Sequence, residues 1–285
     1  MKPIDKPAAG VYDNAIPFRK QIQEALKIMK KLIAVVLCAA MMLCACTAFA
    51  SDTKALEGKK LSIALSPNFM YFETVSETEE CGYEGLDIDI IKELSAMLGF
   101  EFEIVPMSFS SLVGSLQAGS VDMVISGMTY TEERDIVVDF SDVYCTTSVG
   151  CITKVDSEIE TYEALENQIV CCSQGTNYEI LIESIPGAKL KTFQGQAAVG
   201  TAVAEASDGV VAGLTSINGA KKLANTMFDA EGKPMLKYFA LEGAPADEYR
   251  MAFPTGSELV EVINNALAEL KSSGKLDEMI QGWLY

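Results

Sequence analysis

Arg134 is the residue whose type and position point most clearly to chemistry. Thr131 is expected to cap a short helix, which places Arg134 in the first helical turn. A positive charge there opposes the helix dipole by roughly a few tenths of a kcal/mol, which favours a functional reason for it. A planar guanidinium can bind a carboxylate through two parallel hydrogen bonds. The local sequence equally allows a surface ion pair with Glu133 or Asp135.

Two turns offer backbone groups to a ligand. The segment 175–177 (Gly-Thr-Asn) follows an expected strand and opens an expected helix, where free N–H groups can bind an anion. An ordinary glycine-containing loop is the alternative. The segment 126–129 (Ser-Gly-Met-Thr) leaves the end of another expected strand and offers backbone groups and a hydroxyl.

Composition removes several classes of chemistry. The 285-residue chain contains no histidine, the usual general base at neutral pH and the commonest metal ligand. Its eight cysteines form no Cys-x-x-Cys pair, so we expect neither a metal site nor a cofactor. The five cysteines after residue 50 are expected to be buried apolar side chains, with Cys171 and Cys172 on opposite faces of one strand. A net charge of −18 disfavours nucleic acid as a partner.

The N-terminal region, residues 1–50, is predicted to be an extension and an export signal rather than part of the fold. Residues 32–49 are a continuous apolar run after Lys30 and Lys31, followed by a small-residue cleavage-like site before Ser51. Residues 43–46 also resemble a lipobox, in which Cys46 would be lipidated. A retained transmembrane anchor is the alternative. Met29 is an alternative start to Met1.

The rest of the chain alternates strands with helices. Strands are expected at 61–65, 101–105 and 121–125, with helices at 88–98 and 110–118. The pattern restarts near residue 150. Further strands are expected at 168–172, 190–193 and 209–213, and helices after 177 and at 197–206, 216–227 and 258–270. This succession predicts two α/β lobes, each with a mostly parallel sheet flanked by helices and a ligand near the strand ends.

Five stretches in this order resemble the amino-acid-binding solute-binding proteins (family 3) of ABC transporters. They are GLDIDI (85–90), SFSSLVGSLQAGSVDMVISGMTYTEER (108–134), VDFSDVY (138–144), SQGTNYE (173–179) and NNALAELKSSGKLDEMIQGWL (264–284). The resemblance implies the type II periplasmic-binding-protein fold, with the ligand in the cleft between the lobes. It implies a first lobe at 58–146, a second at 147–244 and a segment at 245–285 that returns to the first.

The resemblance also implies roles for individual residues. Arg134 would bind the ligand's carboxylate, and Thr176 and Asn177 in the second lobe would hold the same group. Phe69 and Phe109 would line the ligand's side chain, although each could equally be core. Backbone and hydroxyl groups would come from the remaining candidates, Ser126, Gly127 and Thr129.

Two positions depart from the family pattern. Relatives usually have an acidic residue five positions after the position of Asp208, and it pairs with the ligand's ammonium; counting gives Gly213 here. Relatives often have aspartate where this chain has Ser66. A buried ammonium without an anionic partner is costly. The ligand therefore uses another partner, such as the Gly127 carbonyl or the Thr129 hydroxyl, or lacks a free α-amino group, or the alignment slips across 208–216.

The resemblance implies an exported receptor that binds a small amino-acid-like carboxylate and delivers it to an ABC permease with its ATPase. We expect a monomer that touches the membrane only through a lipid anchor, if it has one. Two other functions remain open, a dehydratase-like enzyme of the same fold and a sensor or adhesive binding module.

Overall fold

The computed structural model describes residues 55–285. These residues belong to one compact unit, Asp52–Tyr285. The predicted signal peptide, the lipidation candidate Cys46 and the alternative start Met29 lie outside the described residues. Within the described part of the chain, the search for a helix that is long and apolar enough to cross a bilayer finds none.

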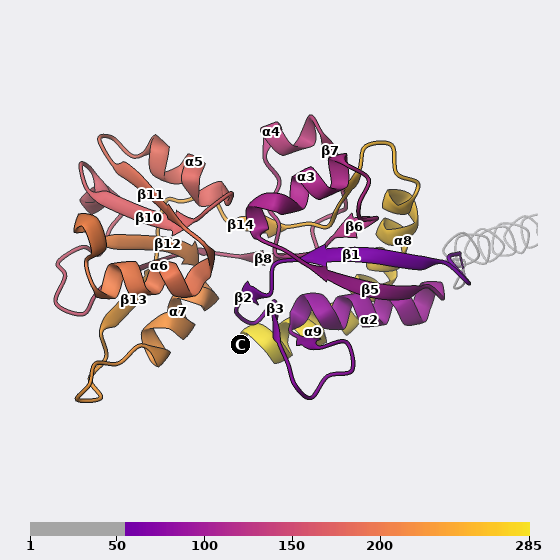
Figure 1. Ribbon diagram of the computed structural model, residues 1–285, viewed down its shortest axis with the longest axis horizontal. Coiled ribbons are helices and arrows are strands. Elements are labelled where there is room, and N and C mark those ends of the chain that lie inside the picture. The colour runs from indigo at the N-terminus through magenta and orange to yellow at the C-terminus, as the bar shows by residue number, and fades with distance from the viewer. Residues whose placement is uncertain (1–54) are drawn as a thin grey trace, which may run out of the picture. The chain divides into compact units, whose positions relative to one another are not determined.

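A five-stranded sheet of order β5-β1-β6-β15-β7 forms the first lobe (Figure 1). β1 pairs in parallel with β5 and β6, whereas β15 runs antiparallel to β6 and β7. A small antiparallel sheet, β2-β3-β4, packs beside it. The strands are β1 (Lys60–Leu65), β2 (Asn68–Phe69), β3 (Glu73–Val75), β4 (Tyr83–Glu84), β5 (Glu101–Pro106), β6 (Met123–Val124), β7 (Val138–Phe140) and β15 (Ala252–Pro254).

Helices cover both faces of the first sheet. One face packs on α2 (Leu86–Leu98), α8 (Leu259–Ser272) and α9 (Lys275–Leu284). The other packs on α3 (Leu112–Gln117), which follows the short 3₁₀ helix η1 (Phe109–Ser111). α2 follows its predicted apolar periodicity, with Ile90, Ile91 and Leu94 fully buried. It ends at Gly99, whose left-handed conformation (φ 80°) is the expected helix stop.

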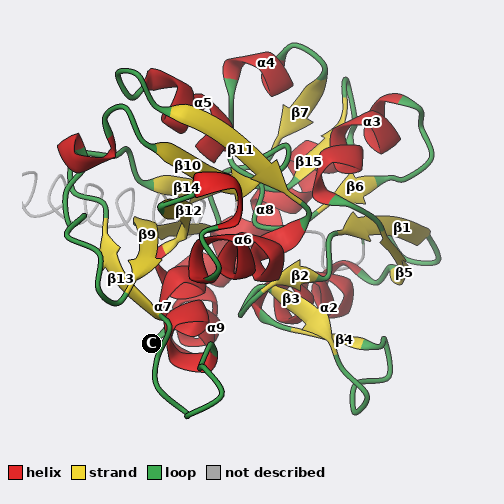
Figure 2. Cartoon of the chain, turned by 60° about the vertical axis from the view of Figure 1, so that its left-hand side comes forward, coloured by secondary structure: helices red, strands yellow, loops and turns green. Residues whose placement is uncertain are grey.

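The second lobe has a sheet of order β11-β10-β12-β9-β13. β10 pairs in parallel with β11 and β12, while β9 is antiparallel to β12 and β13. The elements are β9 (Val149–Lys154), η2 (Glu163–Leu165), β10 (Ile169–Ser173), α5 (Asn177–Ser184), β11 (Lys189–Phe193), α6 (Gly195–Ala204), η3 (Ser207–Gly209), β12 (Ala212–Ser216), α7 (Ile217–Thr226) and β13 (Leu236–Ala240). α5 covers one face, and α6 and α7 cover the other (Figure 2).

Two short strands carry the chain between the sheets. β8 (Cys145–Thr147) leaves the first lobe, β14 (Asp247–Tyr249) returns to it, and the two pair antiparallel (Figure 1). The second sheet is thus an insertion between β7 and β15 of the first sheet. The two-lobe α/β prediction is confirmed, but each sheet combines a parallel core with antiparallel strands that the periodicity did not separate.

The prediction of buried cysteines is confirmed for four of the five described cysteines and is wrong for Cys81, which is only partly buried. All five are free thiols, and four of them are buried. Cys171 joins the core under α6 and α7, whereas Cys172 joins the core under α5, so adjacent residues face opposite sides of β10. Burial raises the pKa of the Cys171 thiol to about 12, which keeps it protonated and unreactive.

Candidate functional site

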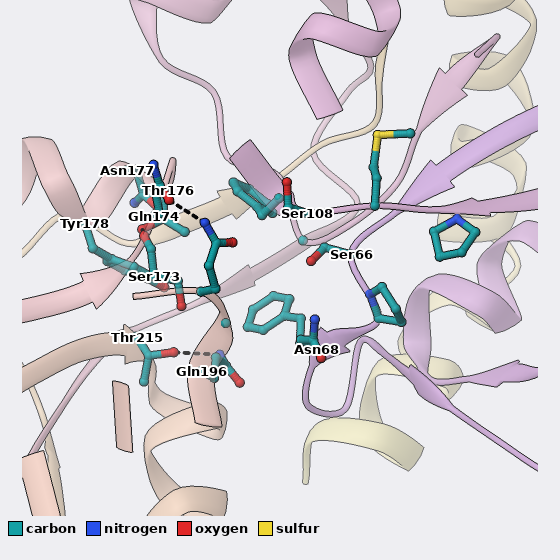
Figure 3. Close-up of a pocket in the computed structure, with 18 of the residues that line it drawn as sticks. Ser66, Asn68, Ser108, Ser173, Gln174, Thr176, Asn177, Tyr178, Gln196 and Thr215 are labelled. Atoms are coloured by element: carbon teal, nitrogen blue, oxygen red, sulfur yellow. Dashed lines mark hydrogen bonds between the residues drawn. The ribbon is translucent and has the colours of Figure 1, made fainter. Parts of the chain in front are cut away.

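A cavity of about 380 Å³ lies between the lobes (Figure 3). Its lining follows the carboxyl ends of the parallel strands: residues 66–69 follow β1, 106–109 end and follow β5, 173–178 end and follow β10, and 194–196 follow β11. This is the usual location of a ligand in an α/β sheet, because several loops meet there. The volume lies in the range of small-molecule sites.

Phe69 and Gly127 form one wall and depend on each other. The Phe69 ring stacks on Phe72 with 4.4 Å between centroids and meets the Tyr249 ring edge-on at 5.9 Å. Gly127 has φ 50°, and a β-carbon there would lie 2.1 Å from Phe69 Cε1. Only glycine leaves room for the aromatic ring at this point. Phe69 and Gly127 both line the cavity, and their contact with a ligand stays a prediction.

A buried pair of carboxyl groups holds this wall from behind. Glu73 on β3 accepts the Ser126 hydroxyl (2.5 Å), and Asp87 on α2 accepts the Gly127 N–H (2.8 Å) and the Tyr144 hydroxyl (2.8 Å). Burial raises the pKa of Asp87 to about 6. Burial and the neighbouring Asp87 raise the pKa of Glu73 well above its usual value.

Ser126 belongs to this support and not to the cavity. Its hydroxyl donates to Glu73 and accepts the Ser66 N–H (2.9 Å), and the residue is fully buried without lining the cavity. The prediction that Ser126 offers its hydroxyl to a ligand is therefore wrong, because that hydroxyl fixes the ends of two strands to each other.

Arg134 lies in α4 (Glu132–Asp135), where Thr131 caps the helix as predicted by accepting the Arg134 N–H. The residue is 9% exposed and forms no ion pair among the described residues, so the surface ion-pair interpretation is wrong. Its Nη1 donates to the carbonyl and hydroxyl of Thr129, and its Nη2 donates to the Gly175 carbonyl of the second lobe (2.7 Å). Burial lowers its pKa to about 10.

The guanidinium lies next to the cavity rather than on its lining. It borders an adjoining hollow together with Glu133, Gly175 and Thr176, and its Cζ lies 5.6 Å from the centre of the Phe109 ring. Phe109 itself lines the cavity, and its contact with a ligand stays a prediction. Thr129 is buried beneath Arg134 and does not reach the cavity. These three acceptors leave two of the five guanidinium N–H groups without a partner in the described residues.

The turn 174–178 supplies the second-lobe wall, and its donors differ from the prediction. Gly175 N–H is taken by the Glu179 carboxylate (2.6 Å), so it is not a free anion donor. Thr176 lines the cavity, but its hydroxyl donates to the Ser173 carbonyl (2.7 Å). Asn177 also lines the cavity, and its amide donates to Asp247 on the crossing strand β14 (2.9 Å).

A group of carboxamides that the sequence analysis missed completes the second-lobe side. Gln196 donates to the Thr215 hydroxyl (2.6 Å), and Gln194 donates to Gln174 (Figure 3). Thr215 could have been found from the sequence, because it stands at the end of a strand, just before Ser216, the residue that caps α7.

Gly213 does not reach the cavity. A β-carbon there would lie 2.8 Å from Val199 Cγ1, inside the core of the second lobe. The cavity-facing residue of β12 is Thr215, two residues further along. The residue of β12 that could face a ligand is therefore Thr215 rather than Gly213, and it has no carboxyl group either.

The chain is similar to known amino-acid-binding proteins in both sequence and structure. The profile of the family described as bacterial extracellular solute-binding proteins, family 3, matches residues 61–285. The arginine-binding extracellular protein ArtP of Bacillus subtilis (strain 168) is 31% identical over 261 residues, covering 90% of this chain and 98% of ArtP. The glutamine-binding protein GlnH of the same organism is 28% identical over 207 residues, 70% of this chain and 72% of GlnH. The crystal structure of the arginine-, lysine-, histidine-binding protein ArtJ from Geobacillus stearothermophilus superposes with a TM-score of 0.70 at 25% identity, covering 79% of this chain and 95% of ArtJ.

Proposed function

Because the chain belongs to the bacterial extracellular solute-binding proteins of family 3, we propose that it is the extracytoplasmic receptor of an ABC importer. The two lobes close around a small carboxylate-bearing ligand and present it to a permease, which its ATPase drives. The names of the arginine-binding and glutamine-binding relatives support an amino acid or a derivative as the ligand class. The protein acts by binding alone, as a monomer and without a cofactor.

The proposed lobes are 58–146 with 245–285, and 147–244. Strand pairing supports this division, because the chain leaves the first sheet after β7 and re-enters it at β15. Contacts on both sides of the cavity support closure: Arg134 donates to the Gly175 carbonyl, and the Met70 N–H donates to Gln196 (3.4 Å). A ligand that contacts both lobes favours the closed state because only that state gains both sets of contacts.

The observation that carries the proposal is the buried guanidinium of Arg134. A buried charge without a carboxylate partner is expensive, and the lowered pKa of Arg134 reflects that cost. A ligand carboxylate would supply the missing anion. The two unpartnered N–H groups and the place of Arg134 at the lobe contact, next to Phe109, fit a carboxylate that enters beside the cavity.

The location follows from the same assignment. We propose export to the periplasm or the outer face of the cytoplasmic membrane, with Cys46 as the lipidation site if the protein is anchored.

The proposal is tested with Arg134→Gln, which removes the charge, and Arg134→Lys, which keeps the charge but loses the two-pronged geometry. A thermal-shift screen of amino acids, their N-acetyl forms and simple organic acids identifies the binder, since a ligand of the native state raises Tm by mass action. We expect Arg134→Gln to weaken binding by about 2–5 kcal/mol and Arg134→Lys to lose much of the affinity. Lys221→Gln, an exposed cation on α7, is the control that should bind normally. Near-native affinity in Arg134→Gln contradicts the proposed function.

A further inference from the structure

The cavity has an unusual charge pattern for a site that would hold an amino acid. None of the described residues that line it is Asp, Glu, Lys or Arg. Its polar groups are hydroxyls, such as those of Ser66, Ser108 and Thr215, and carboxamides, such as those of Gln194 and Gln196. Arg134 borders the adjoining hollow, which shares Thr176 with the cavity, and its guanidinium lies against the Phe109 ring.

The nearby acidic residues are occupied elsewhere. Asp87 accepts the Gly127 N–H and the Tyr144 hydroxyl from behind the first-lobe wall. Asp247 accepts the Asn177 amide and the Tyr178 hydroxyl (2.6 Å) from behind the second-lobe wall.

Burial raises the pKa of both of these carboxyl groups, which further reduces their tendency to carry a charge toward the ligand. Glu179 borders the adjoining hollow rather than the cavity and accepts the Gly175 N–H. The described carboxylates near the guanidinium, Glu133 and Glu179, therefore border the hollow beside Arg134, and none lines the cavity itself.

Two cavity-lining residues with hydroxyl groups, Thr215 and Ser66, come from opposite lobes. Thr215 is buried near the end of β12, and its hydroxyl already accepts the Gln196 amide. Ser66 follows β1 and is 7% exposed. Replacement of either hydroxyl by a carboxyl group would place a negative charge on the cavity wall, so both are natural sites for a test.

On the proposed function, the charge balance then selects the ligand. One ligand carboxylate neutralises the Arg134 guanidinium, but an α-ammonium on the same ligand would add a second positive charge with no anion on the lining to offset it. We propose that the cavity binds a small carboxylate whose nitrogen is acylated or absent, and that free α-amino acids are poor ligands. The carboxamides of Gln194, Gln174 and Gln196 provide both donors and acceptors for the uncharged polar groups of such a ligand, an amide in particular.

The inference rests on the proposed function, and matched ligands separate the two. Isothermal titration of the purified full chain would compare each free amino acid with its N-acetyl form and its des-amino form, for example L-glutamine, N-acetyl-L-glutamine and glutaramic acid. We expect at least one N-acetyl or des-amino acid to bind at least about tenfold more tightly than its free amino acid. A free amino acid that binds as tightly as its own N-acetyl and des-amino forms overturns the inference. The proposed function still stands if Arg134→Gln abolishes binding of the tightest ligand in the panel. It falls if this binding survives Arg134→Gln. A panel without any binder overturns both the inference and the proposed function.

Thr215→Asp tests the charge argument directly, with Thr215→Asn as the uncharged control of the same shape. We expect Thr215→Asp to gain at least about tenfold in affinity for a free amino acid relative to its N-acetyl form, and Thr215→Asn to show no such change. Ser66→Asp provides the same test from the first lobe if Thr215→Asp does not fold. A folded aspartate variant whose preference stays unchanged overturns the inference.

Discussion

The buried pair Glu73 and Asp87 gives the protein a pH dependence whose sign and size can be worked out. Both side chains are fully buried. A carboxyl group whose pKa is higher in the folded than in the unfolded chain holds its proton more tightly when folded. The unfolded chain therefore binds fewer protons between the two pKa values, and the free energy of unfolding falls as pH rises through that interval.

Asp87 makes the free energy of unfolding depend on pH between its ordinary pKa of 3.8 and its folded pKa of about 6. That interval corresponds to on the order of 3 kcal/mol, because each unit is worth about 1.4 kcal/mol. The pKa of Glu73 is raised well above 4.5, so its contribution continues to higher pH. As long as folded Glu73 keeps its proton, each pH unit costs about 1.4 kcal/mol of stability.

Glu73→Gln isolates the second contribution. Glutamine keeps an acceptor for the Ser126 hydroxyl and resembles protonated glutamate, but it does not titrate. We expect the stability advantage of Glu73→Gln over the natural protein to grow as pH rises from 5.5 to 7, by up to about 1.4 kcal/mol per pH unit. Urea denaturation across this range, followed by circular dichroism, measures the difference. Glu84→Gln, in the adjacent strand β4, is the matched control, and its curve should run parallel to the natural protein. A Glu73→Gln curve that also runs parallel refutes the reasoning.

Two glycine substitutions test the geometry of the walls. Gly127→Ala should lower the free energy of unfolding by about 1–3 kcal/mol, because the new methyl group meets the Phe69 ring and φ is positive; a thermal melt within error of the natural protein would show that the ring moves freely. Gly213→Asp should destabilise the second lobe by more than about 3 kcal/mol, because it buries a carboxylate against Val199. Unlike Thr215→Asp, it should bring no gain in affinity for free amino acids in isothermal titration, and such a gain would restore the original count to Gly213.

The elements that sequence periodicity predicted are those whose burial is set locally. α2 has a continuous apolar stripe ending at a glycine, and β10 has an apolar run, so each carries its own signal. The antiparallel strands β9, β13 and β15 carry no comparable signal of direction. Their direction depends on partners far away in the chain, and β15 enters the first sheet only after the whole second lobe.

At the site, too, the local sequence predicted only those features that depend on adjacent residues. The Thr131 cap and the first-turn position of Arg134 follow from adjacent residues and were predicted. The pairing of Glu73 with Asp87 was not, because an acid in the first turn of a helix normally faces solvent. Gly213 and Thr215 share one face of β12, and of these two only Thr215 lies far enough along the strand to reach the cavity, which a count along the sequence does not show.

The buried acids that hold the cavity walls also bear on the proposed ligand specificity. Asp87 and Asp247 lie behind opposite walls, and each fixes a cavity-lining residue, Gly127 or Asn177, by accepting its N–H group. These acids therefore position the lining without presenting their charge to a ligand. Arg134 borders the hollow beside the cavity, and it donates across the lobe contact to the Gly175 carbonyl. A ligand carboxylate that binds this guanidinium adds to a contact that already joins the lobes, so closure and recognition of the negative charge depend on the same side chain.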